Sequence, residues 1–166
     1  MNEIKKIEKL VELLHKNCKL SLEQVAAITE MTTEETATAI DGLEKNGTIL
    51  GYGAVVNWEK LSARNKVTAY IELKVTPQRN NGFNRIAQQI CQFDQVKSLN
   101  LMSGGYDFGV TVEGDNLREI SLFVSEHLAP MESVLSTATH FVLRCFKEDG
   151  VIFPAENEDD REVISL

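Results

Sequence analysis

The stretch from Leu99 to Val112 constrains the fold most strongly, because two runs of alternating hydrophobic residues flank a pair of glycines. Leucines alternate in the first run, and aromatic and β-branched residues alternate in the second run, which begins at Tyr106. Such period-two patterns are typical of β-strands. Gly104-Gly105 can supply the positive backbone angles of a two-residue turn, so the pattern predicts a tight β-hairpin.

The tip of this predicted hairpin carries polar groups as well as glycines. Ser103 and Asp107 flank the two glycines, so a hydroxyl, a carboxylate and backbone N–H groups meet there. This arrangement either is a stable turn and nothing more, or forms a binding site for a small polar ligand. The residues of the tip alone leave both interpretations open.

The composition limits the classes of protein to consider. The 166 residues correspond to one large domain or two small ones, and 43% hydrophobic residues suffice for ordinary cores. The net charge of -8 argues against bulk attraction to nucleic acid or membrane. No apolar run spans a bilayer and no signal-peptide core is present, so we expect a cytoplasmic protein without a membrane partner. The three cysteines follow no disulfide or zinc spacing, so we predict buried, reduced thiols and no metal or cofactor.

Residues 1–57 read as a winged helix-turn-helix. Hydrophobic residues recur at helical spacing over residues 3–16, and Ser21 and Thr32 each begin a capping box before a further helix. Gly47 follows the third helix at the place of a left-handed C-cap. Residues 48–57 resemble two short strands that would form the wing, and residues 58–65 the linker.

The charge of this first unit argues against strong DNA binding. Residues 1–57 carry six lysines and no arginine against nine carboxylates. Neutralisation of phosphates normally supplies most non-specific affinity for DNA, and arginine makes the commonest contact to guanine. The candidate DNA-contacting residues are three threonines of the third helix that could donate to phosphates or touch bases: Thr33, Thr36 and Thr38.

Residues 66–148 show the order strand, helix, strand, strand, helix, strand. The first strand alternates cleanly over residues 67–75, and the last is predicted to run from Val134 to Lys147. This order predicts an α+β fold of the split βαβ, or ferredoxin-like, type, with both helices on one face of an antiparallel sheet. Tyr70, and apolar residues on both faces of the last strand, suggest that another subunit covers the open face. Residues 149–166 are expected to form a solvated acidic tail.

The order of these parts resembles the Lrp/AsnC, or feast/famine, family of transcriptional regulators. Three stretches carry the resemblance over about residues 3–148. They are residues 43–49 leading into Gly51-Tyr52, the turn at 102–107, and residues 137–143 of the last strand.

The resemblance implies an assembly and a binding site. In that family the second domain, of a type also called RAM or ACT-like, forms homodimers that associate into tetramers, octamers or larger rings. Small effectors, usually amino acids, bind between subunits near the glycine turn. Carried over to this chain, the effector-binding residues are those of the turn and the facing strand: Ser103, Gly104, Gly105, Tyr106, Asp107, Thr137 and Thr139.

The third helix departs from the family pattern, in which several positions are basic. This chain has Thr38, Ala39, Asp41 and Gly42 at those positions. One hypothesis is therefore a ligand-responsive, sequence-specific DNA-binding regulator, and a second is a small-molecule sensor with weak or lost DNA binding that acts through protein partners. An enzyme is not expected. Haem-precursor decarboxylases share this build, but the histidines are scattered over different elements and no nucleophile–base pair or metal spacing occurs.

Overall fold

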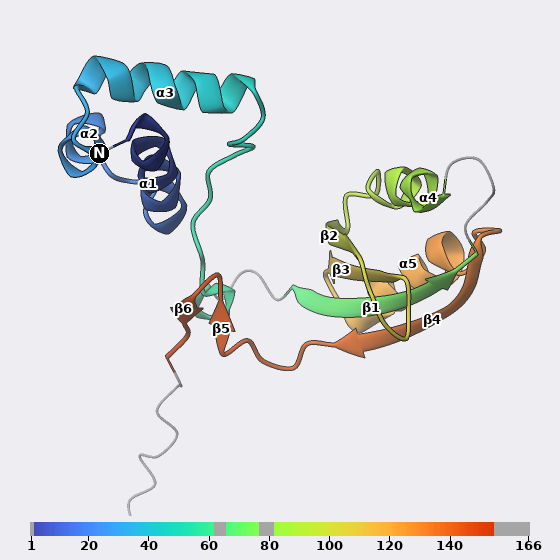
Figure 1. The fold of residues 1–166 in the computed structure, drawn as a ribbon. Coiled ribbons are helices and arrows are strands. Elements are labelled where there is room, and N and C mark those ends of the chain that lie inside the picture. Colours follow the sequence, from blue (N-terminus) through green and yellow to red (C-terminus); the bar gives the residue numbers. More distant parts are fainter. Residues whose placement is uncertain (1, 62–65, 77–81, 155–166) are drawn as a thin grey trace, which may run out of the picture. The chain divides into compact units, whose positions relative to one another are not determined.

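The structure is a computed structural model that describes residues 2–61, 66–76 and 82–154. The predicted linker lies partly outside the described residues, and so does most of the predicted acidic tail. The chain divides into two compact units, Met1–Val55 and Val56–Leu166, which we describe separately (Figure 1). A single turn of 3-10 helix, η1 (Trp58–Lys60), lies near the start of the second unit.

The first unit consists of three helices, α1 (Glu3–Lys16), α2 (Leu22–Thr29) and α3 (Thr33–Lys45). Both predicted capping boxes are present, because Ser21 and Thr32 each accept a backbone N–H and receive a reciprocal side-chain bond. The turn between α2 and α3 passes through Glu30 in the left-handed region, and Gly47 beyond α3 has φ +76°. These local signals explain why the three helices begin and end as the sequence predicts.

The core of this unit is small. Leu10, Val25 and Leu43 are buried, and partly buried residues of α1, of α3 and of the segments flanking α2 pack around them. The apolar spacing of α2 predicts that Ile28 faces inward, but it is 40% exposed. Thr29 is fully buried instead, because its hydroxyl donates to the Val25 carbonyl (2.8 Å) and therefore needs no contact with water.

The prediction that residues 48–57 form a wing of two short strands is wrong. Residues 48–57 contain no strand, although their backbone is described. Ile49 packs against the helical core, but the next residue, Leu50, is 93% exposed. Tyr52 instead donates a hydrogen bond to Glu44 at the end of α3 (2.6 Å).

The second unit has the predicted element order. Its sheet and helix bounds are β1 (Val67–Val75), α4 (Gly82–Ile90), β2 (Val96–Leu101), β3 (Phe108–Gly114), α5 (Leu117–Phe123) and β4 (Val134–Phe141). A turn of π-helix, η2 (Val124–Leu128), extends α5. The strand order is β2-β3-β1-β4, and all three pairings are antiparallel. The predicted order and the antiparallel sheet are therefore confirmed.

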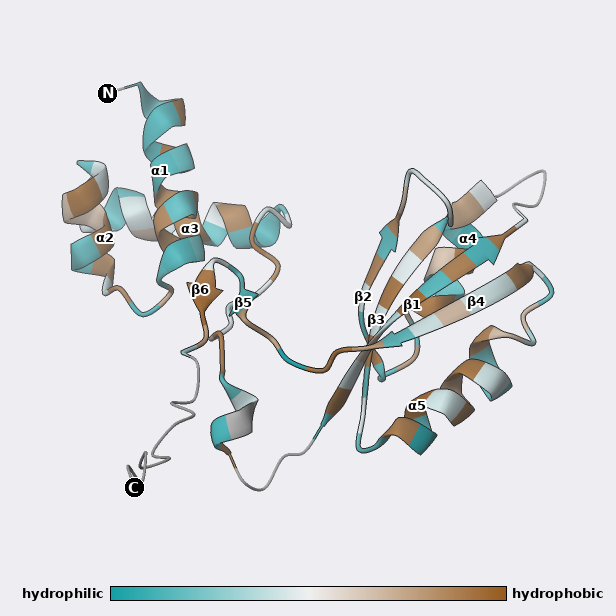
Figure 2. Ribbon diagram, turned by 90° about the horizontal axis from the view of Figure 1, so that it is seen from below, coloured by the Kyte–Doolittle hydropathy of each residue, from teal (hydrophilic) through white to brown (hydrophobic). Residues whose placement is uncertain are grey.

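One core joins the sheet to the two helices, which cover a single face (Figures 1 and 2). Alternate residues of β1 and β3 are buried, including Ile71, Leu73 and Phe108. Ile90 of α4 and Ile120 of α5 close the core from the helix side. The apolar spacing of α5 predicts that Leu117 faces the core, but it is 55% exposed, and Phe123 is buried instead.

The last strand is shorter than predicted. β4 ends at Phe141, so the residues that follow do not occupy two faces of one strand, as the argument for a covering subunit assumed. A separate hairpin pairs β5 (Lys147–Glu148) with β6 (Val151–Ile152) through Asp149 and Gly150, both with positive φ. Apolar residues of this region stay exposed, Ile152 to 72%, and Figure 2 shows β6 in the hydrophobic colour.

The prediction of buried thiols is also wrong. Cys18 and Cys91 are exposed and Cys145 is partly buried, and all three are free. Cys18 and Cys91 lie just beyond the ends of α1 and α4, where the chain leaves the helical core.

We predict that Leu73→Ala destabilises the second unit by about 2–5 kcal/mol, because Leu73 is fully buried in the central strand and its removal leaves a cavity. Leu143→Ala is the matched control, since Leu143 is 96% exposed. Urea unfolding measures both. Equal midpoints for the two variants would contradict the assigned core.

Candidate effector site and DNA-facing helix

The predicted two-residue turn is in fact a longer loop, residues 102–107, which we call the glycine loop. β2 ends at Leu101 and β3 begins at Phe108, and these two residues pair. Gly104 has φ +156°, a positive value that residues other than glycine rarely adopt, but Gly105 has no positive φ. The glycines therefore do not form a tight primed turn, because the ladder between the strands ends too early for one.

Asp107 attaches the glycine loop to β1. Its N–H donates to the Leu73 carbonyl (2.9 Å), as a ladder residue would, while its own carbonyl accepts from the Met102 N–H (2.7 Å). The Asp107 carboxylate Oδ2 accepts from the Val75 N–H (2.8 Å). The side chain thus replaces the backbone acceptor that the ladder no longer offers.

Tyr70 and Tyr106 attach the loop to the face of the sheet that the helices do not cover. The hydroxyls of Tyr70 and Tyr106 are 2.9 Å apart, and their rings meet edge to face. The Tyr70 ring lies across Gly109, where an added Cβ would come within 1.9 Å of the Tyr70 hydroxyl. The hydrogen bond to Tyr106 raises the pKa of Tyr70 to about 12, and burial and nearby Glu72 act in the same direction.

The tip of the glycine loop is exposed. Ser103, Gly104 and Gly105 are all solvent-accessible, and within the described part of the chain none of them takes part in a hydrogen bond. Asp107 holds the loop to β1 and Tyr106 holds it to Tyr70, while the polar groups of the tip stay available to a ligand. The Asp107 carboxylate would suit an ammonium group of a ligand, but one of its oxygens is committed to β1.

The structure does not bring the two predicted threonines to the glycine loop. Thr137 and Thr139 pair with Leu73 and Ile71, so they lie on the helix-covered face of the edge strand β4. Tyr106 reaches the opposite face. Within one chain, β1 lies between these threonines and Asp107, the end of the glycine loop that bonds to β1.

The open face of the sheet is mostly polar. The register places Tyr70, Glu72 and His140 on it, opposite the buried residues of β1. His140 Nε2 lies 3.3 Å from the Glu72 carboxylate and is more than half exposed. This face therefore suits a polar contact more than an extension of the apolar core.

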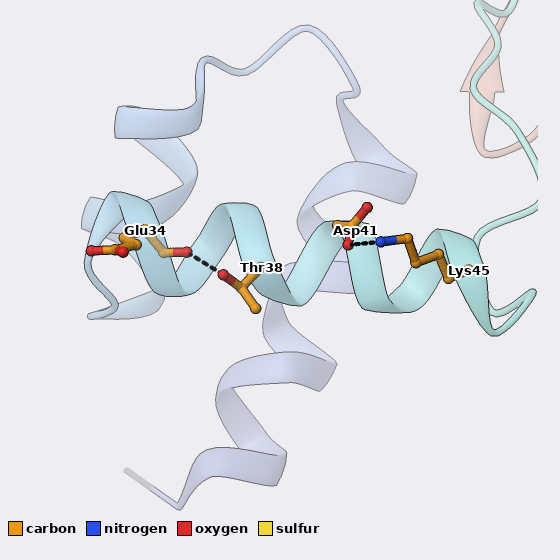
Figure 3. A network of polar contacts seen from close by, with 4 residues as sticks. All are labelled: Glu34, Thr38, Asp41 and Lys45. Carbon is orange, nitrogen blue, oxygen red and sulfur yellow. Dashed lines mark hydrogen bonds and ion pairs between the residues drawn. The ribbon is translucent and has the colours of Figure 1, made fainter.

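Glu34, Thr38, Asp41 and Lys45 form an exposed stripe along α3 that would face DNA (Figure 3). Thr38 donates its hydroxyl to the Glu34 carbonyl (2.9 Å), and Lys45 forms an ion pair with Asp41 (2.6 Å). The stripe therefore presents mainly acceptors, because its hydroxyl proton and its cation are both engaged within the helix.

The three predicted DNA-contacting threonines differ in access. Thr33 is exposed at the start of α3, and Thr38 is exposed on the stripe. Thr36 is fully buried, and its hydroxyl donates to the Thr32 carbonyl (2.8 Å). The prediction that Thr36 contacts DNA is therefore wrong, because Thr36 lies on the face of α3 that packs into the core.

Sequence reasoning missed the two contacts that hold the glycine loop. Tyr70 was singled out only as an uncovered aromatic residue, and Asp107 only as a turn cap or a ligand. Their partners lie more than thirty positions away in the chain. The hairpin through Asp149 and Gly150 contradicts the predicted tail at its first residues, and an Asp-Gly pair is the signal that could have predicted it.

The described residues contain neither a helix long and apolar enough to cross a bilayer nor a group of three potential metal ligands.

Comparisons with known proteins agree with this two-part organisation. The sequence profile of the Lrp/AsnC ligand binding domain matches residues 68–152. An uncharacterized HTH-type transcriptional regulator of Bacillus subtilis (strain 168), YugG, is 39% identical over 165 residues, which cover 99% of each chain.

Two solved structures share the fold. The transcriptional regulator NMB0573 of Neisseria meningitidis, in complex with L-Met, has a TM-score of 0.69 at 19% identity, and covers 90% of this chain and 95% of its own. Escherichia coli AsnC has a TM-score of 0.64 at 16% identity, with 85% and 92% covered. These likenesses concern the fold.

A helical unit followed by a ligand-binding α+β domain defines a class of transcriptional regulators. The profile match and the B. subtilis relative show which one it is: the chain belongs to the Lrp/AsnC family. The resemblance inferred from the sequence is confirmed, and the relatives are regulators and not enzymes.

We predict that Asp107→Ala lowers the free energy of unfolding by about 1–3 kcal/mol, because the Val75 N–H loses its acceptor. Amide exchange at Val75 should accelerate as well. The exposed Asp94 is the matched control, and Asp94→Ala should change stability by less than about 0.5 kcal/mol. Unchanged exchange at Val75 would contradict the assigned role of Asp107.

We predict that stability falls between pH 10 and about 12, because folded Tyr70 keeps its proton there while an unfolded tyrosine loses it. Phenolate absorbance measures the ionisation. The chain has three tyrosines, so Tyr52→Phe leaves only Tyr70 and Tyr106 to titrate. Adding Tyr106→Phe should move the Tyr70 pKa back toward 10, and an unmoved titration would contradict the hydroxyl pair.

Proposed function

We propose that this chain is a ligand-responsive, sequence-specific DNA-binding transcriptional regulator whose effector is an amino acid. The observation that carries the proposal is the glycine loop, whose exposed tip is held to β1 by Asp107 and to the open face by Tyr106. A fixed loop with unused backbone groups is suited to binding a carboxylate. The complex of the similar Neisseria regulator with L-Met supports an amino-acid effector.

The effector site lies between subunits in this proposal. The loop tip supplies Ser103, Gly104 and Gly105, with Tyr106 and Asp107 behind them. Thr137 and Thr139 of a second chain form the facing side, since their own chain does not bring them to the loop. A homodimer that associates into a tetramer or octamer would supply such contacts.

Effector binding controls transcription through the assembly. A ligand between subunits favours one geometry of the assembly, which sets the spacing of the α3 helices on DNA. Thr33 and Thr38 are the accessible ones of the three predicted threonines, while Glu34 repels phosphate. Each helical unit then binds DNA weakly, and several units act together.

Fluorescence anisotropy with duplex DNA from the chain's own upstream region tests this function. We expect binding at low salt that weakens as salt rises, and a change of roughly 5–150-fold in DNA affinity with the cognate L-amino acid. Gly105→Val should abolish that response, because a side chain there has open space but covers the loop backbone. Gly105→Ala is the matched, smaller change and should weaken it less.

The DNA-facing surface is tested in the same assay. Glu34→Gln should strengthen binding about threefold by removing a repulsive charge, whereas Glu12→Gln on α1 should have little effect. A chain that binds amino acids but no DNA under any of these conditions would overturn the regulator function. It would fit a sensor that acts through protein partners.

A further inference from the structure

A cavity of about 180 Å³ lies in the second unit between α4 and the turn that precedes β4. Arg85, Ile86 and Gln89 line it from α4, and Met131, Glu132 and Ser133 line it from the turn. None of these residues belongs to the glycine loop. The cavity is therefore a separate feature from the proposed effector site.

The cavity is lined by two oppositely charged side chains, Arg85 and Glu132, that are available to a ligand. Arg85 and Glu132 are both exposed, and within the described ranges neither takes part in an ion pair or hydrogen bond. Guanidinium groups bind carboxylates through two parallel hydrogen bonds, and a carboxylate accepts from an ammonium group. One cavity thus offers a partner for each end of a zwitterion.

The floor of the cavity is apolar and belongs to the core. Ile86 is 4% exposed and buried in the main cluster, and Met131 packs against the same cluster. These side chains would contact an aliphatic group between the two charges.

The turn that carries Glu132 is fixed. The Val134 N–H donates to the Met131 carbonyl (2.8 Å), and the Thr76 N–H donates to the Ser133 carbonyl (2.8 Å). The backbone on both sides of Glu132 is therefore held in place, which lowers the cost of ordering this side of the cavity on binding.

We propose that this cavity binds an α-amino acid with an aliphatic side chain, with its carboxylate on Arg85, its ammonium group on Glu132 and its side chain over Ile86 and Met131. A volume of this size accommodates a ligand smaller than the drug-sized molecules of ordinary pockets. The site goes beyond the proposed function, which places an effector at the glycine loop.

Methyl NMR of the full-length protein tests the proposal, because the chain has four methionines and two of them report on different sites. Met131 lines the cavity and Met102 lies in the glycine loop. Titration with L-leucine at millimolar concentration should shift the Met131 signal. Arg85→Gln and Glu132→Gln should each weaken the apparent affinity at Met131 about tenfold or more, since each removes a charge-assisted bond.

Two kinds of control make the result specific. Arg118→Gln and Glu126→Gln remove exposed charges from α5 and η2 and should leave the titration unchanged. Isocaproate lacks the ammonium group and isoamylamine lacks the carboxylate, so both should bind at least about tenfold more weakly than L-leucine.

The outcomes separate this site from the proposed effector site. A Met131 signal that does not move with L-leucine, or that moves equally in the charge variants, overturns the amino-acid site. Equal binding of isocaproate overturns it in favour of a simple anion site. A shift at Met102 alone leaves the proposed function intact, and a shift at Met131 alone supports the cavity site without the effector site.

Discussion

The hydrogen bond from the Val75 N–H to the Asp107 carboxylate is the contact on which the candidate site depends. β1 is an inner strand of the sheet. At its C-terminal end, Val75 and Thr76 form hydrogen bonds with segments next to its two neighbouring strands, β3 and β4. The glycine loop attaches on the β3 side through Asp107, and the start of β4 attaches through the bond from Thr76 to Ser133. A buried strand thus fixes two segments that would otherwise be exposed connections with few restraints.

This attachment explains why the glycine loop can present its backbone. The loop closes through the bond from the Met102 N–H to the Asp107 carbonyl and is otherwise held to the sheet through Asp107 and Tyr106. Among the described residues, Ser103 to Gly105 have no hydrogen-bond partner as a result. Gly105 therefore matters for access to the backbone, since it has no positive φ, whereas Gly104 also supplies a positive φ that other residues rarely adopt.

Features with a local cause could be predicted from the sequence, and features with a distant partner could not. The capping boxes at Ser21 and Thr32 and the alternation of β1 depend on neighbours within a few residues. Other features depend on whether a strand finds a pairing partner: the wing, the end of β4 and the length of the glycine loop. The spacing of apolar residues in the sequence does not show whether such a partner exists. Of the candidate site, the glycine tip followed from the sequence, while Asp107 bonding to Val75 required the fold.

The acidic α3 has a consequence for regulation if the proposed function holds. Lys6 and Lys9 donate to carbonyls at the end of α2, and Lys45 pairs with Asp41, so several lysines of the first unit are engaged before DNA arrives. Repulsion between exposed charges is screened beyond about 8 Å, so it weakens each unit without excluding contact. When single units bind weakly, total affinity rises steeply with the number that engage at once. An effector that alters the assembly then changes DNA occupancy more than it could if each unit bound tightly alone.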